Sequence, residues 1–222
     1  MPRSGTIGTA NGVSIDLAAW DAVQAQVDLS VACMFAHEKA GSGPAGGLRH
    51  LDEALGGALT TLRSSGSFKA AFMETLLVSV PQTGIAADAL LIIGLGDPAG
   101  WTPATSASAV AAAVRQAAQR GARTVAFAPS LLDAGFDASS IAGVTPQMLA
   151  ALVEALESQK RIAEHHLAPP LSLARWVFDV GAAHFDGAFA QFRDALSACR
   201  GASCAGDMAD EVIPSRKPED LA

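Results

Sequence analysis

Three glycines and an aspartate gather at the end of an apolar run, in the stretch LLIIGLGDPAG. A buried strand that ends in such a turn is where many α/β proteins hold a phosphate or a nucleotide. The dinucleotide fingerprint needs G-x-G-x-x-G and an acidic residue about 20 positions later. Gly94, Gly96 and Gly100 give G-x-G-x-x-x-G, and no acidic residue occurs between Asp97 and Asp133. The phosphate-loop template fails too, because no Lys-Ser or Lys-Thr follows the last glycine.

A more general ligand site at this position stays open. Ligands of parallel α/β sheets lie beside the carboxyl ends of the strands, and the glycines of GPAGG would supply a second loop there. The residues of this predicted ligand site are Gly46, Gly47, Gly94, Gly96, Asp97 and Ser130. The alternative interpretation is a structural turn that only ends a strand.

The five histidines do not predict a metal centre. His165 and His166 are adjacent, so on a helix they point about 100° apart and cannot share an ion as an i,i+4 pair would. His184 is interpreted as a packed interface residue, and His37 and His50 as solvated. The sequence has no G-x-S-x-G elbow and no cysteine in a recognisable activating context. We therefore predict no catalytic residue, no metal and no cofactor.

The composition is that of an acidic globular chain of 222 residues, long enough for one domain with additions. Its 15 lysines and arginines against 22 acidic residues give a net charge of −7, which repels nucleic acid and anionic membranes. The start MPRSGTIGTANG lacks the apolar core of a signal peptide, and no run reaches the roughly 18 apolar residues of a membrane span. We predict a soluble, cytoplasmic protein.

Residues up to about 130 predict alternating strands and helices. The runs 13–17 and 28–36 are rich in strand formers, and the continuous apolar run 89–96 predicts a strand buried on both faces. Leucines recur every three or four positions over 48–62, which predicts a helix that a central glycine pair divides in two. The alanine-rich stretch 106–120 predicts a helix leading into the strand TVAFAPS. Strand, helix and strand then form a right-handed βαβ unit.

Residues after about 143 predict two long helices. Thr145 can cap the first helix, and Pro169 and Pro170 forbid its continuation. The second is predicted over 173–196 from an apolar stripe that begins with Leu173 and Trp176. The two helices would form a hairpin, and the stretch from 201 onward predicts a mobile tail because it has little apolar periodicity.

Five segments follow one another in a recognisable order: DLSVACMF, GPAGGLRHLDEALGGAL, SSGSFKAAFMETLLV, ALLIIGLGDP and the alanine-rich helix before GARTVAFAP. In this order they resemble the N-terminal domain of the leucyl aminopeptidase family, the zinc or manganese cytosolic aminopeptidases. The resemblance implies a macrodomain-like sheet that carries none of the family's catalytic residues. Those belong to a larger C-terminal domain, whose N-T-D-A-E-G-R motif this sequence lacks.

The predicted fold is α/β, with a macrodomain-like, mixed and partly parallel sheet flanked by helices in residues 13–143. A helical hairpin over 144–200 and a tail over 201–222 would follow. The resemblance implies a stand-alone, non-catalytic domain that serves as an assembly or regulatory module, with the hairpin contacting a protein partner or a second copy. One alternative is a small-molecule or ADP-ribose-like nucleotide binder, although HEKAGSG stands where such macrodomains carry an N-A-A-N-like segment. The other is an aminopeptidase in name whose metal-binding domain is missing.

Overall fold

A mixed seven-stranded sheet forms the centre of the computed structural model, which describes residues 3–20, 22–37, 46–79, 84–131, 134–136, 141 and 143–206. The strand order is β1-β2-β7-β6-β3-β5-β4. The strands are β1 (Ser4–Ala10), β2 (Val13–Ala18), β3 (Leu29–Phe35), β4 (Thr75–Val78), β5 (Leu90–Gly96), β6 (Thr124–Ala128) and β7 (Arg175–Asp179).

The five inner strands run parallel, from β2 through β7, β6 and β3 to β5, while β1 and β4 are antiparallel edge strands. Every residue of β3 and β5 is buried, which confirms the prediction of a strand covered on both faces. The predicted βαβ unit is also confirmed, since a helix connects β5 to β6 and both strands pair in parallel with β3 between them. The carboxyl ends of the inner strands therefore meet at one edge.

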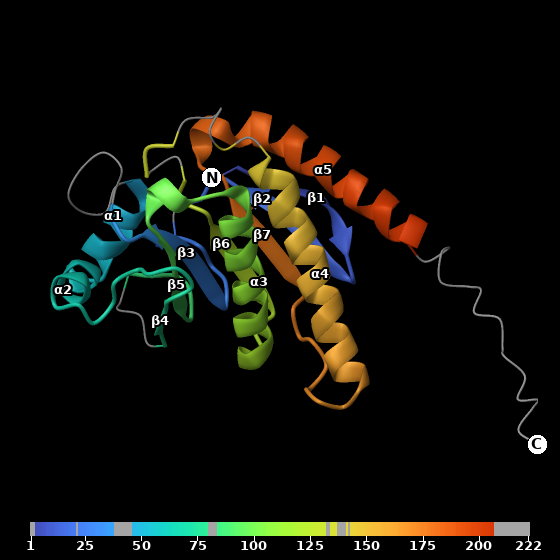
Figure 1. Ribbon diagram of the computed structural model, residues 1–222, viewed down its shortest axis with the longest axis horizontal. Helices are drawn as coiled ribbons and strands as arrows, with labels where there is room; N and C mark the ends of the chain where they lie inside the picture. Colours follow the sequence, from blue (N-terminus) through green and yellow to red (C-terminus); the bar gives the residue numbers. More distant parts are fainter. Residues whose placement is uncertain are drawn as a thin grey trace, which may run out of the picture.

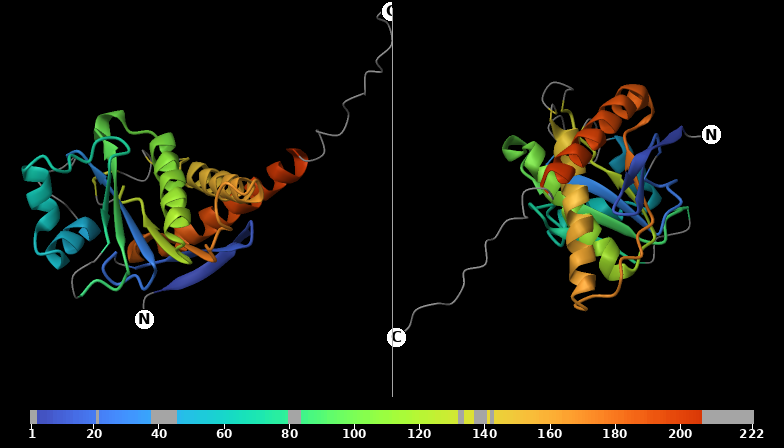
Figure 2. Two further views of the ribbon diagram at one scale, coloured as in Figure 1. Left: turned by 90° about the horizontal axis from the view of Figure 1, so that it is seen from below. Right: turned by 90° about the vertical axis from the view of Figure 1, so that its right-hand side faces the viewer.

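Helices cover both faces of the sheet. They are α1 (Gly46–Ala54), α2 (Ala58–Ser64), α3 (Pro103–Arg120), α4 (Val144–Glu164) and α5 (Phe185–Gly206), with short 3-10 turns η1 (Pro98–Gly100) and η2 (Ala182–His184). Residues of α3, α4 and α5 form one apolar core with the sheet, and residues of α1 and α2 form the other. Figure 1 shows α3 and α4 side by side across the sheet, and Figure 2 shows the sheet between α3 and the α1–α2 pair.

The glycine pair ends one helix and begins the next, as predicted. Gly57 has a left-handed backbone with φ 79° immediately before α2, a conformation that most other residues avoid. The two helices are linked by Asp52, a residue of α1 that is 8% exposed. Its carboxylate accepts hydrogen bonds from the backbone N–H groups of Leu59 and Thr60, at 2.9 and 3.2 Å, and so caps α2 from the preceding helix.

The prediction of a second helix over 173–196 is wrong over its first half. Residues Arg175–Asp179 form β7, which lies between β2 and β6 in the middle of the sheet. Spacings of three and four in the apolar residues suggested a helix, but Trp176, Val177 and Phe178 are consecutive and all fully buried, as in a strand covered on both faces. Gly181, with φ 69°, separates this strand from the helical residues that follow.

The two C-terminal helices pack against each other, but they are not a simple hairpin placed after the sheet. Because β7 pairs with β2 and β6, one sheet takes strands from both sides of residue 143. β1, which was not predicted from the sequence, extends the sheet and contacts α5. The helix α5 continues to Gly206, into the predicted tail, and residues 207–222 lie outside the described part of the chain. No helix in the described part is long and apolar enough to cross a membrane.

Candidate functional site

Four of the six predicted site residues lie at the carboxyl edge of the sheet. Gly94 and Gly96 are among the last three residues of β5, Asp97 follows directly, and Ser130 comes two residues after β6. The parallel pairing of β3 with both β5 and β6 brings these strand ends to the same edge. This is the edge at which ligands of parallel α/β sheets are found.

Gly94 and Gly96 are packed against the protein's own backbone. A Cβ at Gly94 would come within 2.1 Å of the Ala71 carbonyl oxygen, and one at Gly96 within 3.3 Å of the Phe72 Cβ. Gly96 also has a left-handed backbone, with φ 75°. These glycines are therefore required by the close approach of the segment before β4, and no ligand is needed to account for them.

The backbone amides of both glycines already have acceptors within the chain. The N–H of Gly94 donates to the carbonyl oxygen of Glu74 at 2.8 Å, and that of Gly96 donates to the carbonyl oxygen of Ala70 at 3.0 Å. In return, the Met73 N–H donates to the Gly94 carbonyl oxygen at 2.9 Å. Donors of the kind that hold a phosphate in glycine-rich loops are thus used to hold residues 70–74.

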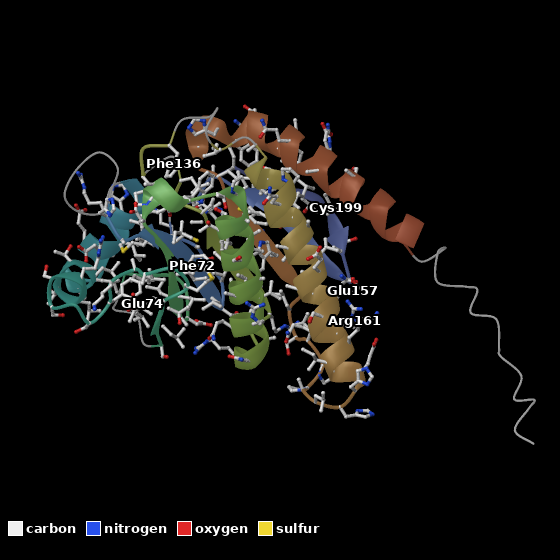
Figure 3. The ribbon with its side chains drawn as sticks, in the orientation of Figure 1. Phe72, Glu74, Phe136, Glu157, Arg161 and Cys199 are labelled. Carbon is white, nitrogen blue, oxygen red and sulfur yellow. The ribbon has the colours of Figure 1, made fainter. Side chains whose placement is uncertain are left out.

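The segment 70–74, which we call the edge segment, has an unusual backbone. Ala70 and Met73 have φ angles of 54° and 61°, which is uncommon for residues other than glycine. The Glu74 carboxylate stabilises this path by accepting hydrogen bonds from the backbone N–H groups of Lys69 and Ala71, both at 3.0 Å. Figure 3 shows Phe72 and Glu74 close to β4 and β5, and the Phe72 side chain is 58% exposed.

Asp97 has a local structural role. Its carboxylate accepts a hydrogen bond from the backbone N–H of Ala99 at 2.8 Å and so caps η1. The Nε2 of His37, which follows β3, lies 3.6 Å from the same carboxylate oxygen. Both side chains are largely exposed, as predicted for His37, and an ion pair between such groups contributes little stability.

Aromatic side chains fill the same edge beyond β3. The ring of Phe136 stacks on that of Phe35 with a centroid distance of 5.3 Å and lies 4.8 Å from the ring of Trp101. The indole N–H of Trp101 donates to the Ser106 hydroxyl at 3.1 Å. Phe35 and Phe136 are buried, and Figure 3 places Phe136 near η1. Ser130, with φ 55°, is half-buried and precedes Phe136 by six residues in the sequence.

The remaining two predicted residues, Gly46 and Gly47, begin α1. Residues 38–45, which include the rest of the predicted GPAGG loop, lie outside the described part of the chain. The ligand-binding role of all six residues stays a prediction. What the structure adds is the edge segment, which sequence reasoning missed because a left-handed Ala70 or Met73 leaves no signal in composition or periodicity.

Two buried carboxylates are satisfied within the fold. Asp52 caps α2, and its second oxygen accepts a hydrogen bond from the Thr60 hydroxyl at 2.5 Å. Asp16 on β2 accepts hydrogen bonds from the Arg175 Nε on β7 at 2.6 Å and from the Ser14 hydroxyl at 3.0 Å. Within the described residues, no group of three or more His, Cys, Asp or Glu side chains could hold a metal ion.

A shallow cavity lies at the opposite edge of the molecule. Its volume is about 180 Å³, and its lining includes Gln119 at the end of α3, Gln159 on α4 and Leu167. Ligand pockets usually measure about 300–1,000 Å³. This cavity is small by that standard, and it contains none of the predicted site residues.

A family model described as the N-terminal domain of the cytosol aminopeptidase family matches residues 31–161. The chain belongs to this family. A probable cytosol aminopeptidase of Acidobacterium capsulatum is 42% identical over 77 residues, which are 35% of this chain and 15% of that protein. These findings confirm the resemblance to the leucyl aminopeptidase N-terminal domain.

Solved structures show the same fold in the cytosol aminopeptidase family and in macrodomains. A tomato leucine aminopeptidase mutant superposes with a TM-score of 0.65 at 19% identity, over 88% of this chain and 37% of that one. An Oceanobacillus iheyensis macrodomain with ADP gives a TM-score of 0.56 at 13% identity, over 93% and 99% of the two chains. The macrodomain-like fold prediction is thereby confirmed. The chain spans little more than a third of the tomato enzyme.

Proposed function

We propose that this cytosol aminopeptidase N-terminal-type domain is non-catalytic and acts as an assembly or regulatory module through contacts with protein. The main support for this proposal is the edge segment, which packs against Gly94 and Gly96 and accepts the hydrogen bonds of their amides. The aromatic cluster of Phe35, Trp101 and Phe136 fills the neighbouring space. An edge filled by the chain itself favours a role that depends on surfaces over one that depends on a bound substrate.

The exposed apolar residues support this proposal. Phe72 and Leu77 are 58% and 37% exposed, and both lie in or just after the edge segment. The third large apolar side chain that is exposed among the described residues, Leu167, follows α4. Exposed apolar surface marks protein contact sites where it is contiguous. The net charge of −7 supports a protein partner over nucleic acid or an anionic membrane. The family description supports a cytoplasmic location, which we include in the proposal.

The two C-terminal helices remain a second proposed contact surface. Figure 1 shows α5 extending past the sheet. The outer face of α4 is polar, with an ion pair between Glu157 and Arg161 at 3.5 Å (Figure 3). A second ion pair joins Lys160 and Glu164 at 4.0 Å. Such a face favours a weaker, salt-sensitive contact than an apolar one would.

An aminopeptidase assay tests the non-catalytic proposal. The purified chain is incubated with leucyl amide and either Mn²⁺ or Zn²⁺, with and without a chelator. We expect no release of leucine above the metal-only control. Turnover that co-purifies with the chain and disappears on chelation would contradict the proposal.

Nucleotide binding is the second candidate function, and the macrodomain-like fold favours it. Thermal unfolding with ADP-ribose and ADP tests it, because a ligand at a hundredfold excess over its Kd adds about 2.7 kcal/mol to the free energy of unfolding. We expect no change in Tm with either compound. An increase in Tm that Asp97→Asn or Gly96→Ala weakens, while Gly100→Ala preserves it, would establish this second function instead.

A further inference from the structure

The two edges of the sheet differ in how they are protected. β1 has an irregular register between Thr6 and Gly8, and α5 packs across it with the Phe189 ring so close that a Cβ at Gly5 would come within 2.8 Å. Bulges and covering helices are the usual means of preventing strand addition at an edge. β4, at the other end of the sheet, has neither within the described residues.

The pairing of β4 with β5 determines which of its backbone groups are free. Glu74 accepts the Gly94 amide, and hydrogen-bonded pairs alternate along an antiparallel ladder. Leu76 and Val78 therefore bond to β5, while the backbone N–H and C=O groups of Thr75 and Leu77 point away from the sheet. No strand of the described part of the chain pairs with that side.

The side chains on this edge do not prevent the addition of another strand. Residues 75–79, TLLVS, contain no charged residue and no proline, the two commonest forms of protection in an edge strand. Thr75, Leu77 and Ser79 are exposed, whereas Leu76 and Val78 pack against the core beneath α1 and α2. An extended, neutral strand is the chemistry that matches this row of free amides and carbonyls.

We propose that the occupant of this edge is a second copy of the same chain, paired with β4 in antiparallel fashion across a two-fold axis at Leu77. The proposal rests on the assembly role proposed above and gives it a surface. In this register Leu77 lies opposite Leu77 of the second copy, and Thr75 lies opposite Ser79 of the second copy. Thr75 and Leu77 expose free backbone groups, and Ser79 directly follows the strand, so residues 75–79 can pair with a second copy of themselves, as a two-fold interface requires.

The local charge pattern allows this pairing. Because residues 75–79 are neutral, no like charges would face each other across the two-fold axis. A four-residue strand buries little area, and contacts below about 1,200 Å² are generally weak and transient. The dimer is therefore expected to form reversibly with rising concentration, against the long-range repulsion between two chains of charge −7.

Sedimentation velocity over a wide concentration range, up to the solubility limit, tests the proposal on the full chain. The wild type is expected to shift reversibly from monomer to dimer. Leu77→Pro removes one outward N–H from each copy without breaking a bond to β5, and Leu77→Lys places two like charges opposite each other. Each variant is expected to raise the dimer Kd by at least about tenfold. Leu167→Lys, at an exposed leucine far from β4, is expected to leave the Kd unchanged.

Far-UV circular dichroism and Tm of the Leu77 variants confirm that the fold is kept. A wild type that stays monomeric at every concentration would overturn the proposal and leave a strand of another protein as the occupant. A dimer that neither Leu77 variant weakens would also overturn it. The leucyl amide assay is independent of these results. Turnover by an intact dimer would contradict only the non-catalytic role, and a wild type that is inactive but stays monomeric would contradict only the β4 pairing.

Discussion

Gly94 lies directly against Ala71: a Cβ placed on Gly94 would lie only 2.1 Å from the Ala71 carbonyl oxygen. The edge segment packs on β5 at this contact, which leaves no room for a side chain. The close packing is a physical reason for a glycine where the sequence suggested a ligand loop. Any larger residue would push the edge segment away from the strand, together with the exposed Phe72.

Gly94→Ala is expected to reduce the free energy of unfolding by about 1–3 kcal/mol, the usual range for overpacking a filled site. Urea denaturation measures the change. Gly100→Ala is the matched control, because a Cβ there meets nothing within 4 Å. Equal stability of the two variants would show that the edge segment does not pack on β5 as described.

Asp52→Ala is expected to lower the free energy of unfolding by about 1–2 kcal/mol, because α2 loses its cap. Glu53→Ala, at the neighbouring exposed position that pairs with Arg49, is expected to cost less than about 0.5 kcal/mol. The comparison uses the same denaturation measurement. Similar costs for both variants would contradict the capping role.

Arg175→Met tests the strand that replaces the predicted helix. Removing one partner of a fully buried ion pair costs about 3–5 kcal/mol, and since the Arg175 side chain is partly exposed we expect about 2 kcal/mol. Arg193→Met removes an exposed partner of Asp194 and is expected to change stability by less than about 0.5 kcal/mol. A negligible effect at Arg175 would argue against the pairing of β7 with β2.

Burial raises the pKa of the Cys33 thiol, because this residue of β3 is buried in the core. Above about pH 8.5 the unfolded chain loses this proton while the folded chain keeps it, so stability falls as the pH rises, by up to about 1.4 kcal/mol per pH unit. Below that pH both states hold the proton and the effect vanishes. Denaturation at several alkaline pH values measures the slope. Cys33→Ala is expected to flatten it, and an unchanged slope would contradict the assignment to Cys33.

Sequence patterns predicted the parts of the fold that depend on local chemistry. The leucine spacing and the glycine pair gave two short helices in the right place, and the apolar run at 89–96 gave the central strand. They failed at Trp176, Val177 and Phe178, because a short apolar run satisfies both a helical and a strand period, and only the position in the sheet decides.

The candidate site shows a different limit. Gly94, Gly96 and Asp97 were identified from the sequence because a glycine-rich turn ends the continuous apolar run 89–96. What surrounds them was not, since the edge segment reaches β5 through two left-handed residues, Ala70 and Met73, that no propensity favours. A tertiary contact stabilises that backbone, and the sequence of either segment alone does not reveal it.

Amide hydrogen exchange at Gly94 and Gly96, followed by NMR with and without ADP-ribose, tests whether the edge segment or a ligand accepts these amides. If the edge segment accepts these amides, both exchange slowly in the free protein, as core amides do, and ADP-ribose leaves their rates unchanged. Rapid exchange in the free protein that slows when ADP-ribose is added would show an open site that a ligand fills, and would contradict the hydrogen bonding of these amides to the edge segment.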